Sequence, residues 1–330
     1  MPIEQQISEN RTFLMGISIL SIMLFHQVWI WGKNPFFAFF HLYGDWGVDV
    51  FFFVSGFGLY YSLKKDSAII PFYKRRIVRM MPLCIVCGLV RYIADHILPV
   101  GHGGYPTGIH PVTTDWMTIL SFDRWFIPVI LVYYVVMPFL FKAINIYGKK
   151  IMLGVMFVAV WGLCFFAVNQ YTHRFPSFCL GAVTAAGLIH MTKRMIMIGT
   201  FAIIAAMIYK FMWKIGLWGI HEDIYTYIIL SFGIVLLCSV LLKGNSFQPN
   251  GRVVIVISPI KKGLNFLGKH TLELYLVHET IYRYTYRFLI NTSIPLSVQI
   301  LIAITVSMIV AITLGYISNR LVNLAKHQLV

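Results

Sequence analysis

Residues 12–31 read TFLMGISILSIMLFHQVWIW, a run of twenty residues without Asp, Glu, Lys or Arg. A helix needs about twenty mostly apolar residues to cross the hydrocarbon core of a bilayer, so this run predicts a transmembrane helix. The preceding residues, MPIEQQISENR, are polar, and no small-residue cleavage site follows the run. The first helix is therefore expected to be retained and not removed as a signal peptide.

Similar apolar runs recur along the whole chain of 330 residues, of which 58% are hydrophobic and only 12% charged. Soluble domains carry about a quarter charged residues. We found no Gly/Ser linker and no long polar block, so we expect one integral-membrane domain over residues 1–330 without an appended soluble domain. The predicted fold is an all-α polytopic membrane bundle of about ten transmembrane helices. These spans lie near 12–31, 46–63, 78–98, 125–143, 151–168, 175–190, 195–213, 224–242, 271–290 and 297–318.

The positions of the basic residues predict how the bundle is oriented. Most of the 27 Lys and Arg residues fall into alternate loops, above all the loop 64–79. Because cytoplasmic loops are enriched in Lys and Arg, both termini and this loop are predicted to face the cytoplasm. The segment 99–124 is then extracytoplasmic, and loops of that length often cover a functional site.

The net charge of +15 limits the classes of partner. In a chain this apolar, anionic membrane lipid and phosphate-bearing ligands are better suited to the charge than nucleic acid, which we do not expect as a partner. All five cysteines sit in apolar runs and are interpreted as small buried residues. Cys84 and Cys87 have the spacing of one helical turn, and no further Cys or His pair completes a zinc site. We predict no metal site and no disulfide framework.

Ionisable residues inside predicted spans are candidates for function, because burying them in a membrane is costly. His26 can act as a general base near neutral pH, although a histidine that joins two helices by a hydrogen bond would look the same. Asp49, in GVDVFFFVSGFGLYY, could orient His26 across the first two helices, or could simply face water. Ser55 is a conceivable nucleophile without a nucleophile-elbow motif. The small residues around it favour close helix contacts.

Two further groups of residues carry charge near the predicted spans. Arg75, Arg76 and Arg79 lie in FYKRRIVRMMP, and Arg76 and Arg79 would share one helix face as a clamp for phosphates. The alternative is an anchor that binds lipid headgroups. In the ninth span, Glu273 or His278 could line a cavity, or could form a structural contact between helices. Glu279 follows directly.

Six ordered motifs give the chain a resemblance to a known family. They are G-I-x-I-L-x-x-x-x-x-H ending at His26, G-x-x-G-V-D-x-F-F-x-x-S-G-F at 44–57, F-Y-x-R-R-x-x-R-x-x-P at 72–82, W-F-x-x-x-x-L-x-Y-Y-x-x-x-P at 125–138, R-F-P-S-F-x-L-G at 174–181 and L-G-K-H-T-L-E-L-Y-L-V-H at 267–278. In this order the motifs resemble the acyltransferase-3 family of membrane-bound O-acyltransferases, whose members are ten-helix proteins of similar length.

The resemblance implies an enzyme that moves an acyl group, commonly acetyl, onto hydroxyls of envelope carbohydrates. It implies that His26 is the essential histidine and that Arg76 and Arg79 form the Arg-x-x-Arg motif of the family. The basic residue expected eleven positions before the histidine is Met15 here, and Arg11, one turn earlier, could replace it. Thr12 stands where the family often has an acidic residue.

The fourth span also departs from the pattern of the family. Trp125 is present, but Ile130 and Leu131 stand where the Trp-x-Leu-x-x-Glu-Glu form has glutamates. A role carried by those glutamates would be absent or moved, with Glu273 as the candidate.

We therefore expect a multi-pass protein of the inner (cytoplasmic) membrane that uses acyl-CoA as donor substrate and has no permanently bound cofactor. Arg75, Arg76 and Arg79 would hold the phosphates of the donor, and His26, supported by Asp49, would activate a carbohydrate acceptor. The acyl group could be acetyl or succinyl, and the sequence predicts neither the acceptor glycan nor an oligomeric state. The alternatives are a small-molecule transporter or exporter and a non-catalytic subunit of a polysaccharide assembly complex.

Overall fold

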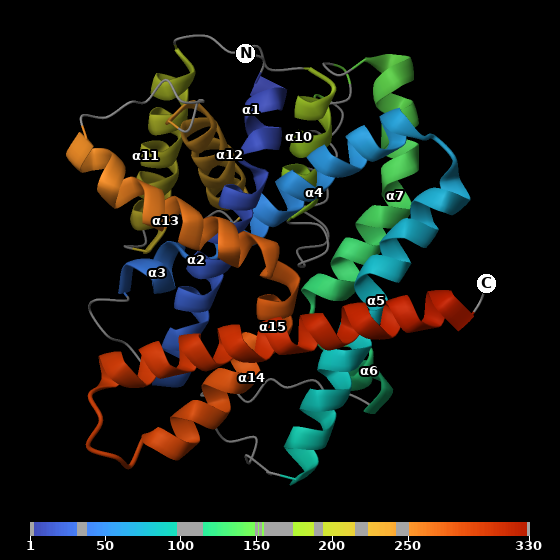
Figure 1. Cartoon of the computed structure of the whole chain (residues 1–330). Helices are drawn as coiled ribbons and strands as arrows, with labels where there is room; N and C mark the ends of the chain where they lie inside the picture. The colour runs from blue at the N-terminus through green and yellow to red at the C-terminus, as the bar shows by residue number, and fades with distance from the viewer. Residues whose placement is uncertain are drawn as a thin grey trace. The chain divides into compact units, whose positions relative to one another are not determined.

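A computed structural model describes residues 3–31, 38–97, 115–148, 151, 154, 174–187, 194–214, 224–241 and 251–328. Every regular element within these ranges is an α-helix, as predicted (Figure 1). The helices are α1 (Ile3–Glu9), α2 (Arg11–Trp31), α3 (Ala38–Tyr43), α4 (Trp46–Lys65), α5 (Ile69–Ile97), α6 (Asp115–Ile119), α7 (Phe126–Tyr147), α10 (Phe175–Ala185), α11 (Met195–Lys214), α12 (Ile224–Leu241), α13 (Gly251–Lys269), α14 (Thr271–Leu289) and α15 (Leu296–Gln328).

Nine of the ten predicted spans coincide with a helix among the described residues. Most agree within a few residues, but α5 begins nine residues before its predicted span and α15 ends ten residues after its own. The span predicted at 151–168 lies almost entirely outside the described residues. The apolar runs did not predict α1, α3, α6 and α13, because the first three are short and α13 mixes apolar residues with lysines.

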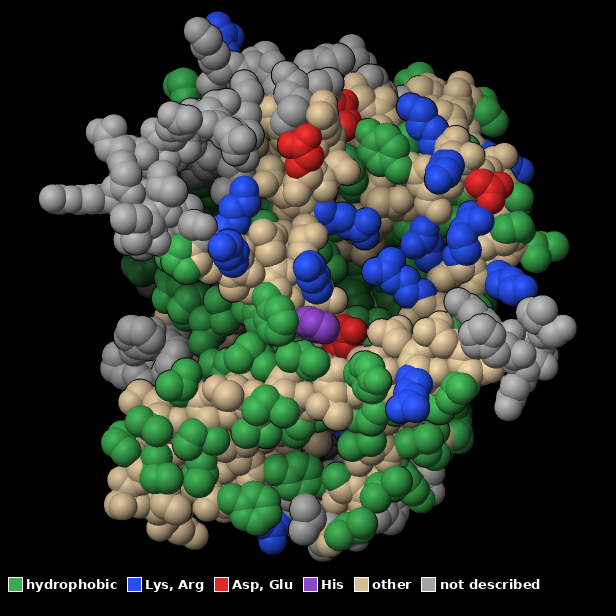
Figure 2. All heavy atoms as spheres, in the orientation of Figure 1, with side chains coloured by type: hydrophobic (Ala, Val, Ile, Leu, Met, Phe, Trp, Pro, Cys, Tyr) green, Lys and Arg blue, Asp and Glu red, His purple; other side chains and the backbone are tan. Residues whose placement is uncertain are grey.

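Within the described ranges, four helices are long and apolar enough to cross a membrane: Trp46–Lys65, Ile69–Ala94, Phe126–Tyr147 and Leu296–Leu324. Large hydrophobic side chains also lie at the surface (Figure 2), among them Ile70 and Phe201, which are 80% and 74% exposed. Exposed apolar residues on this scale are typical of a surface that faces lipid. The chain is a membrane protein, while the number of ten spans and the cytoplasmic position of both termini stay predictions.

The segment 64–79, predicted as a loop, is mostly helical. Residues 66–68 alone separate α4 from α5, and the Asp66 carboxylate accepts a hydrogen bond of 3.0 Å from the backbone N–H of Ala68. An Asp side chain that accepts from the backbone N–H two residues on forms an Asx turn, which is common in short connections. The arginines of the predicted loop therefore lie on α5, and no long connection separates them from the third span.

The chain divides into two compact units, each assembled from three segments. The first comprises Met1–Ser18, Asp45–Phe72 and Val129–Lys269, and the second comprises Ile19–Gly44, Tyr73–Pro128 and His270–Val330. The single-domain prediction remains a prediction.

Close backbone contacts at glycine hold the first unit together. A Cβ atom on Gly56 of α4 would lie 2.0 Å from the carbonyl oxygen of Phe178 on α10, and one on Gly181 would lie 1.9 Å from that of Phe53. The neighbouring α10 and α4 (Figure 1) thus pack backbone to backbone. This confirms the prediction that small residues on the second span permit close helix contact.

In the second unit, α14 packs on α15 (Figure 1), and Ile300 of α15 is the centre of an apolar cluster. The partly buried residues around Ile300 are Leu24, Trp31, Phe40, Leu296 and Ile304. The C-terminal half of α2, with His26, thus lies in the same unit as α14.

Candidate active site

His26, His278 and Glu279 lie together in the second unit. Nδ1 of His26 on α2 is 2.8 Å from Nε2 of His278 on α14, and the two rings stack with centroids 5.1 Å apart. Nε2 of His26 lies 3.6 Å from Oε1 of Glu279. His278 is fully buried, whereas the side chains of His26 and Glu279 are 18% and 19% exposed. The site is therefore anchored in the interior and reachable at His26.

The hydrogen bonds assign the proton positions on both imidazole rings. Nδ1 of His278 is 2.8 Å from the carbonyl oxygen of Leu274, and a carbonyl oxygen can only accept, so this nitrogen carries a proton. In a neutral His278 the other nitrogen, Nε2, must then accept a hydrogen bond from Nδ1 of His26. It follows that Nε2 of neutral His26 carries the free lone pair, on the side of Glu279.

Arg124, just before α7, holds Glu279 in place. Its Nη1 donates to Oε2 of Glu279, and its Nη2 donates to Oγ1 of Thr280 at 3.0 Å. A guanidinium that contacts two successive residues of one helix fixes the orientation of the carboxylate. Oε1 of Glu279 is left to face His26.

A second ion pair supports Arg124. Nε of Arg124 lies 3.7 Å from Oδ2 of Asp123, and Oδ1 of Asp123 accepts a hydrogen bond of 2.7 Å from Nη2 of Arg91 on α5. The same Nη2 donates to the carbonyl oxygen of Thr118 at 3.0 Å. Arg91 is buried, so these contacts tie the turn that carries Asp123 and Arg124 firmly to α5.

Ser121 shapes that turn. Its φ of +60° lies in the left-handed region that side chains seldom adopt, and its Oγ donates a hydrogen bond of 2.9 Å to the carbonyl oxygen of Cys84. Strained backbone of this kind is common where a loop positions functional groups.

This arrangement can accept a proton. The lone pair on Nε2 of His26 can take a proton from a hydroxyl, and the imidazolium that forms would face an ionised carboxylate 3.6 Å away. His278 maintains the tautomer, and Glu279 stabilises the charged state. The division of roles follows the logic of a catalytic triad.

The same three residues could also bind a cation, since one ligand atom from each lies within 4.8 Å of the others. No metal site was predicted from the sequence. Glu279 is, however, engaged by Arg124, whose positive charge opposes a second cation at the same carboxylate. The arrangement suits proton transfer better than coordination of a metal.

Asp49 lies in the first unit, fully buried on α4. Its Oδ1 accepts a hydrogen bond of 2.6 Å from Oγ of Ser177, and its Oδ2 accepts one from Arg174, which also donates to Asp45. These contacts join α4 to the start of α10. The predicted pair of Asp49 with His26 stays a prediction.

The predicted donor-binding arginines lie on α5. Arg76 is half-buried, and Arg75 and Arg79 are exposed. Arg76 and Arg79 are one helical turn apart, as the predicted clamp requires.

The remaining predicted residues are more scattered. Trp125 directly follows Arg124 and is half-buried, and Ser55 is half-buried in the middle of α4. The guanidinium of Arg11 lies against Gly58 of α4. Oε1 of Glu273 lies 4.0 Å from Nδ1 of His270. Glu273 precedes His278 on α14 by more than one helical turn.

Arg124, Asp123 and Arg91 were not selected from the sequence, and Glu279 was noted without a role. The available signal was the pair Asp123 and Arg124 immediately before the W-F motif, together with Arg91 inside a predicted span. Oppositely charged side chains in apolar surroundings often form ion pairs. Only the fold shows a series of contacts that ends at His26 and runs through Arg91, Asp123, Arg124 and Glu279.

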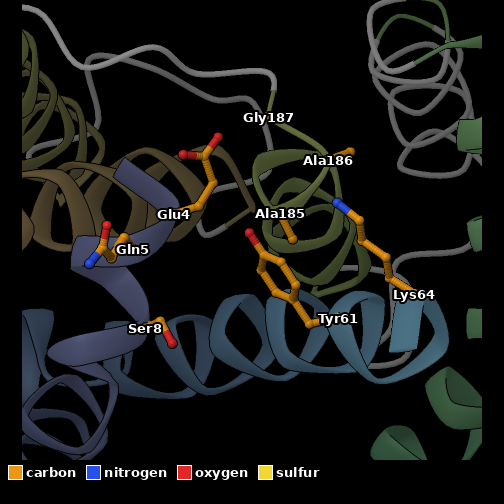
Figure 3. Close-up of a pocket in the computed structure, with 8 residues that line it drawn as sticks. All are labelled: Glu4, Gln5, Ser8, Tyr61, Lys64, Ala185, Ala186 and Gly187. Carbon is orange, nitrogen blue, oxygen red and sulfur yellow. The ribbon is translucent and has the colours of Figure 1, made fainter. Parts of the chain in front are cut away.

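A pocket of about 460 Å³ lies elsewhere, in the first unit (Figure 3). Its lining residues come from α1, α4 and the end of α10, and they are Glu4, Gln5, Ser8, Tyr61, Lys64, Ala185, Ala186 and Gly187. The pocket contains none of the predicted site residues.

A family model described as an acyltransferase domain matches residues 13–317, which is nearly the whole chain. No curated protein and no solved structure matches it.

Proposed function

The chain belongs to the acyltransferase-3 family, and on that premise we propose that this membrane acyltransferase moves an acetyl group from cytoplasmic acetyl-CoA to a hydroxyl of an envelope carbohydrate. The proposed location is the inner (cytoplasmic) membrane. The observation that carries the proposal is the free lone pair on Nε2 of His26, held by the hydrogen bond to His278 and facing Glu279.

In the proposed reaction His26 acts as general base. Nε2 takes the proton of the acceptor hydroxyl while the oxygen attacks the thioester carbonyl carbon. A carbon–oxygen bond forms, the carbon–sulfur bond breaks, and the departing thiolate receives the proton from His26 to give free CoA. Glu279 stabilises the imidazolium between these two transfers.

Glu279 would thereby supply the carboxylate that the sequence lacks at Ile130 and Leu131. Glu273 had been the candidate for this role, but the carboxylate 3.6 Å from His26 belongs to Glu279. Arg124, which precedes Trp125, holds it.

On the donor side, Arg75, Arg76 and Arg79 would bind the phosphates of CoA. Their positions on one stretch of α5, with two of them exposed, support this role. Arginine suits it because the planar guanidinium binds phosphate through two parallel hydrogen bonds.

The test uses the purified protein in lipid nanodiscs with labelled acetyl-CoA and an envelope glycan. His26→Gln should lower kcat about 100-fold or more, because the general base is lost. The double change Arg76→Gln, Arg79→Gln should raise KM for acetyl-CoA. Lys142→Gln, an exposed change on α7, is the control and should alter neither constant.

Two results would contradict the proposal. Full transfer by the His26→Gln protein would show that His26 is not the general base. Solute flux in reconstituted vesicles without any transfer of the label would favour the transporter alternative.

A further inference from the structure

Gln27, next to His26 on α2, is fully buried. Neither Nε2 nor Oε1 has a hydrogen-bond partner among the residues that the structure describes. A glutamine amide has two donors and one acceptor group, and nearly all buried groups of this kind are paired in folded proteins. An unpaired buried amide beside the candidate base therefore requires an explanation.

Tyr282 on α14 presents the same situation one turn beyond His278. The side chain is fully buried, and its hydroxyl has no partner within the described part of the chain. Its ring lies 5.8 Å from that of His278 and 5.4 Å from that of Trp31, both edge to face. Helical spacing puts His278 and Tyr282 on one side of α14.

The matching side of α2 carries Gln27 and Trp31, which are also four residues apart. His26 contacts His278, and Trp31 contacts Tyr282, so these faces of α2 and α14 meet over slightly more than one helical turn. Gln27 lies on α2 between the two contacts. The two unsatisfied groups thus belong to the same helix pair as the candidate base.

Aromatic residues continue this surface away from His26. Trp31 also lies edge to face with Tyr286 at 6.0 Å, and its Nε1 donates to Oε1 of Gln299 at 3.3 Å. Both Trp31 and Tyr286 are half-buried. Along this helix pair the order of groups is the half-buried aromatic pair, a buried hydroxyl and amide, and then the half-buried imidazole.

We propose that Gln27 and Tyr282 bind the hydroxyl groups of a polyhydroxylated acceptor and hold it with one hydroxyl at Nε2 of His26. This inference rests on the proposed function. The amide donates to one hydroxyl and accepts from its neighbour, so a vicinal diol satisfies both of its atoms. Tyr282 donates to a third oxygen. The ring of Trp31, which lies edge to face with that of Tyr282, borders this subsite.

The lack of hydrogen-bond partners at Gln27 and Tyr282 among the described residues has a consequence for the thermal stability of the protein. Replacing a buried polar group that has no partner by an apolar group of similar size removes no hydrogen bond. Gln27→Leu and Tyr282→Phe should therefore leave the Tm unchanged or raise it. Gln299→Leu is the matched control, because this buried glutamine accepts from Trp31 and donates to the carbonyl oxygen of Ile294 at 2.9 Å, and its loss should lower the Tm.

The kinetic test measures KM for the glycan and for acetyl-CoA in the same nanodiscs. Gln27→Leu should raise KM for the glycan at least about tenfold, because a site that recognises hydroxyls loses its partner groups, while KM for acetyl-CoA stays unchanged. Tyr282→Phe should act in the same direction. Tyr275→Phe, one turn to the other side of His278, should leave KM for the glycan unchanged.

Each failure has a distinct signature. If the wild-type protein transfers no acetyl group, the proposed function fails. If wild-type transfer is normal and Gln27→Leu leaves KM for the glycan unchanged, the subsite is wrong although the function stands. A lower Tm of Gln27→Leu would show that the amide has a structural partner, which would also overturn the subsite.

Discussion

His278 determines which nitrogen of His26 is free. To keep the tautomer of His26, a side chain at position 278 needs only an acceptor atom near the position of Nε2 of His278. The amide oxygen of glutamine supplies such an acceptor. We expect His278→Gln to retain a kcat at least about tenfold higher than that of His278→Leu, which offers no acceptor. Steady-state acetyl transfer at saturating substrates measures the difference. Equal rates for the two variants would show that the tautomer does not depend on His278.

Arg124 acts on His26 through Glu279. Arg124→Met should lower kcat about tenfold or more, because Glu279 is no longer oriented and a largely buried carboxylate is left without its cation. Arg124→Lys should recover little activity, since an ammonium cannot contact Glu279 and Thr280 in the same way. Arg320→Met, at an exposed position of α15, is the control and should keep the wild-type rate. A wild-type kcat in Arg124→Met would exclude the positioning role.

Residues differed in how well the sequence identified them. His26 stands alone in twenty residues without another ionisable group, so its position is conspicuous. Arg124 follows a polar loop, where a charged residue is unremarkable. The functional role of Arg124 depends on its contact with Glu279, 155 positions away, and no local sequence pattern predicts such a contact.

The contact between α4 and α10 depends on the absence of a side chain at Gly56. Gly56→Ala should lower the free energy of unfolding by about 1–3 kcal/mol, because the new methyl group would lie 2.0 Å from the carbonyl oxygen of Phe178. Gly263→Ala on α13 meets nothing within 4 Å among the described residues and should be neutral or stabilising by up to about 1 kcal/mol. Thermal unfolding in detergent compares the two variants, and equal melting temperatures would contradict the packing.

Asp49 gives a second test of the same pair of helices. Asp49→Asn should destabilise the protein by about 3–5 kcal/mol, since Arg174 would lose its fully buried partner. The measurement is the unfolding midpoint in detergent, together with the pH dependence of kcat at a temperature where the variant is folded. An unchanged midpoint combined with a changed pH profile would instead support the predicted role of Asp49 beside His26.

At the level of elements, apolar runs predicted the helices well, and charge was the main source of error. The lysines of α13 and the arginines at the start of α5 interrupt the hydropathy pattern, so these residues were assigned to loops. Both segments are helical, because charged residues of this kind are good helix formers even where they are poor membrane residues.

For the whole molecule, the prediction concerns orientation. A cysteine at Lys74 should react with a membrane-impermeant maleimide in inside-out vesicles but not in intact cells, since the basic segment is expected to face the cytoplasm. A cysteine at Thr107 should show the reverse. Labelling of both positions from the same side would contradict the predicted topology.

The amino-acid sequence alone determined that this chain is an all-helical membrane protein of the acyltransferase-3 type and that His26 is its best candidate base. These properties follow from local composition and from short ordered motifs, which require no knowledge of distant contacts. Tertiary structure alone decided that His278 and Glu279 flank His26 in the second unit, and that Gln27 and Tyr282 are buried without hydrogen-bond partners among the residues that the structure describes. Hydrogen bonds and burial depend on which helix faces meet, and that pairing is a property of the folded chain.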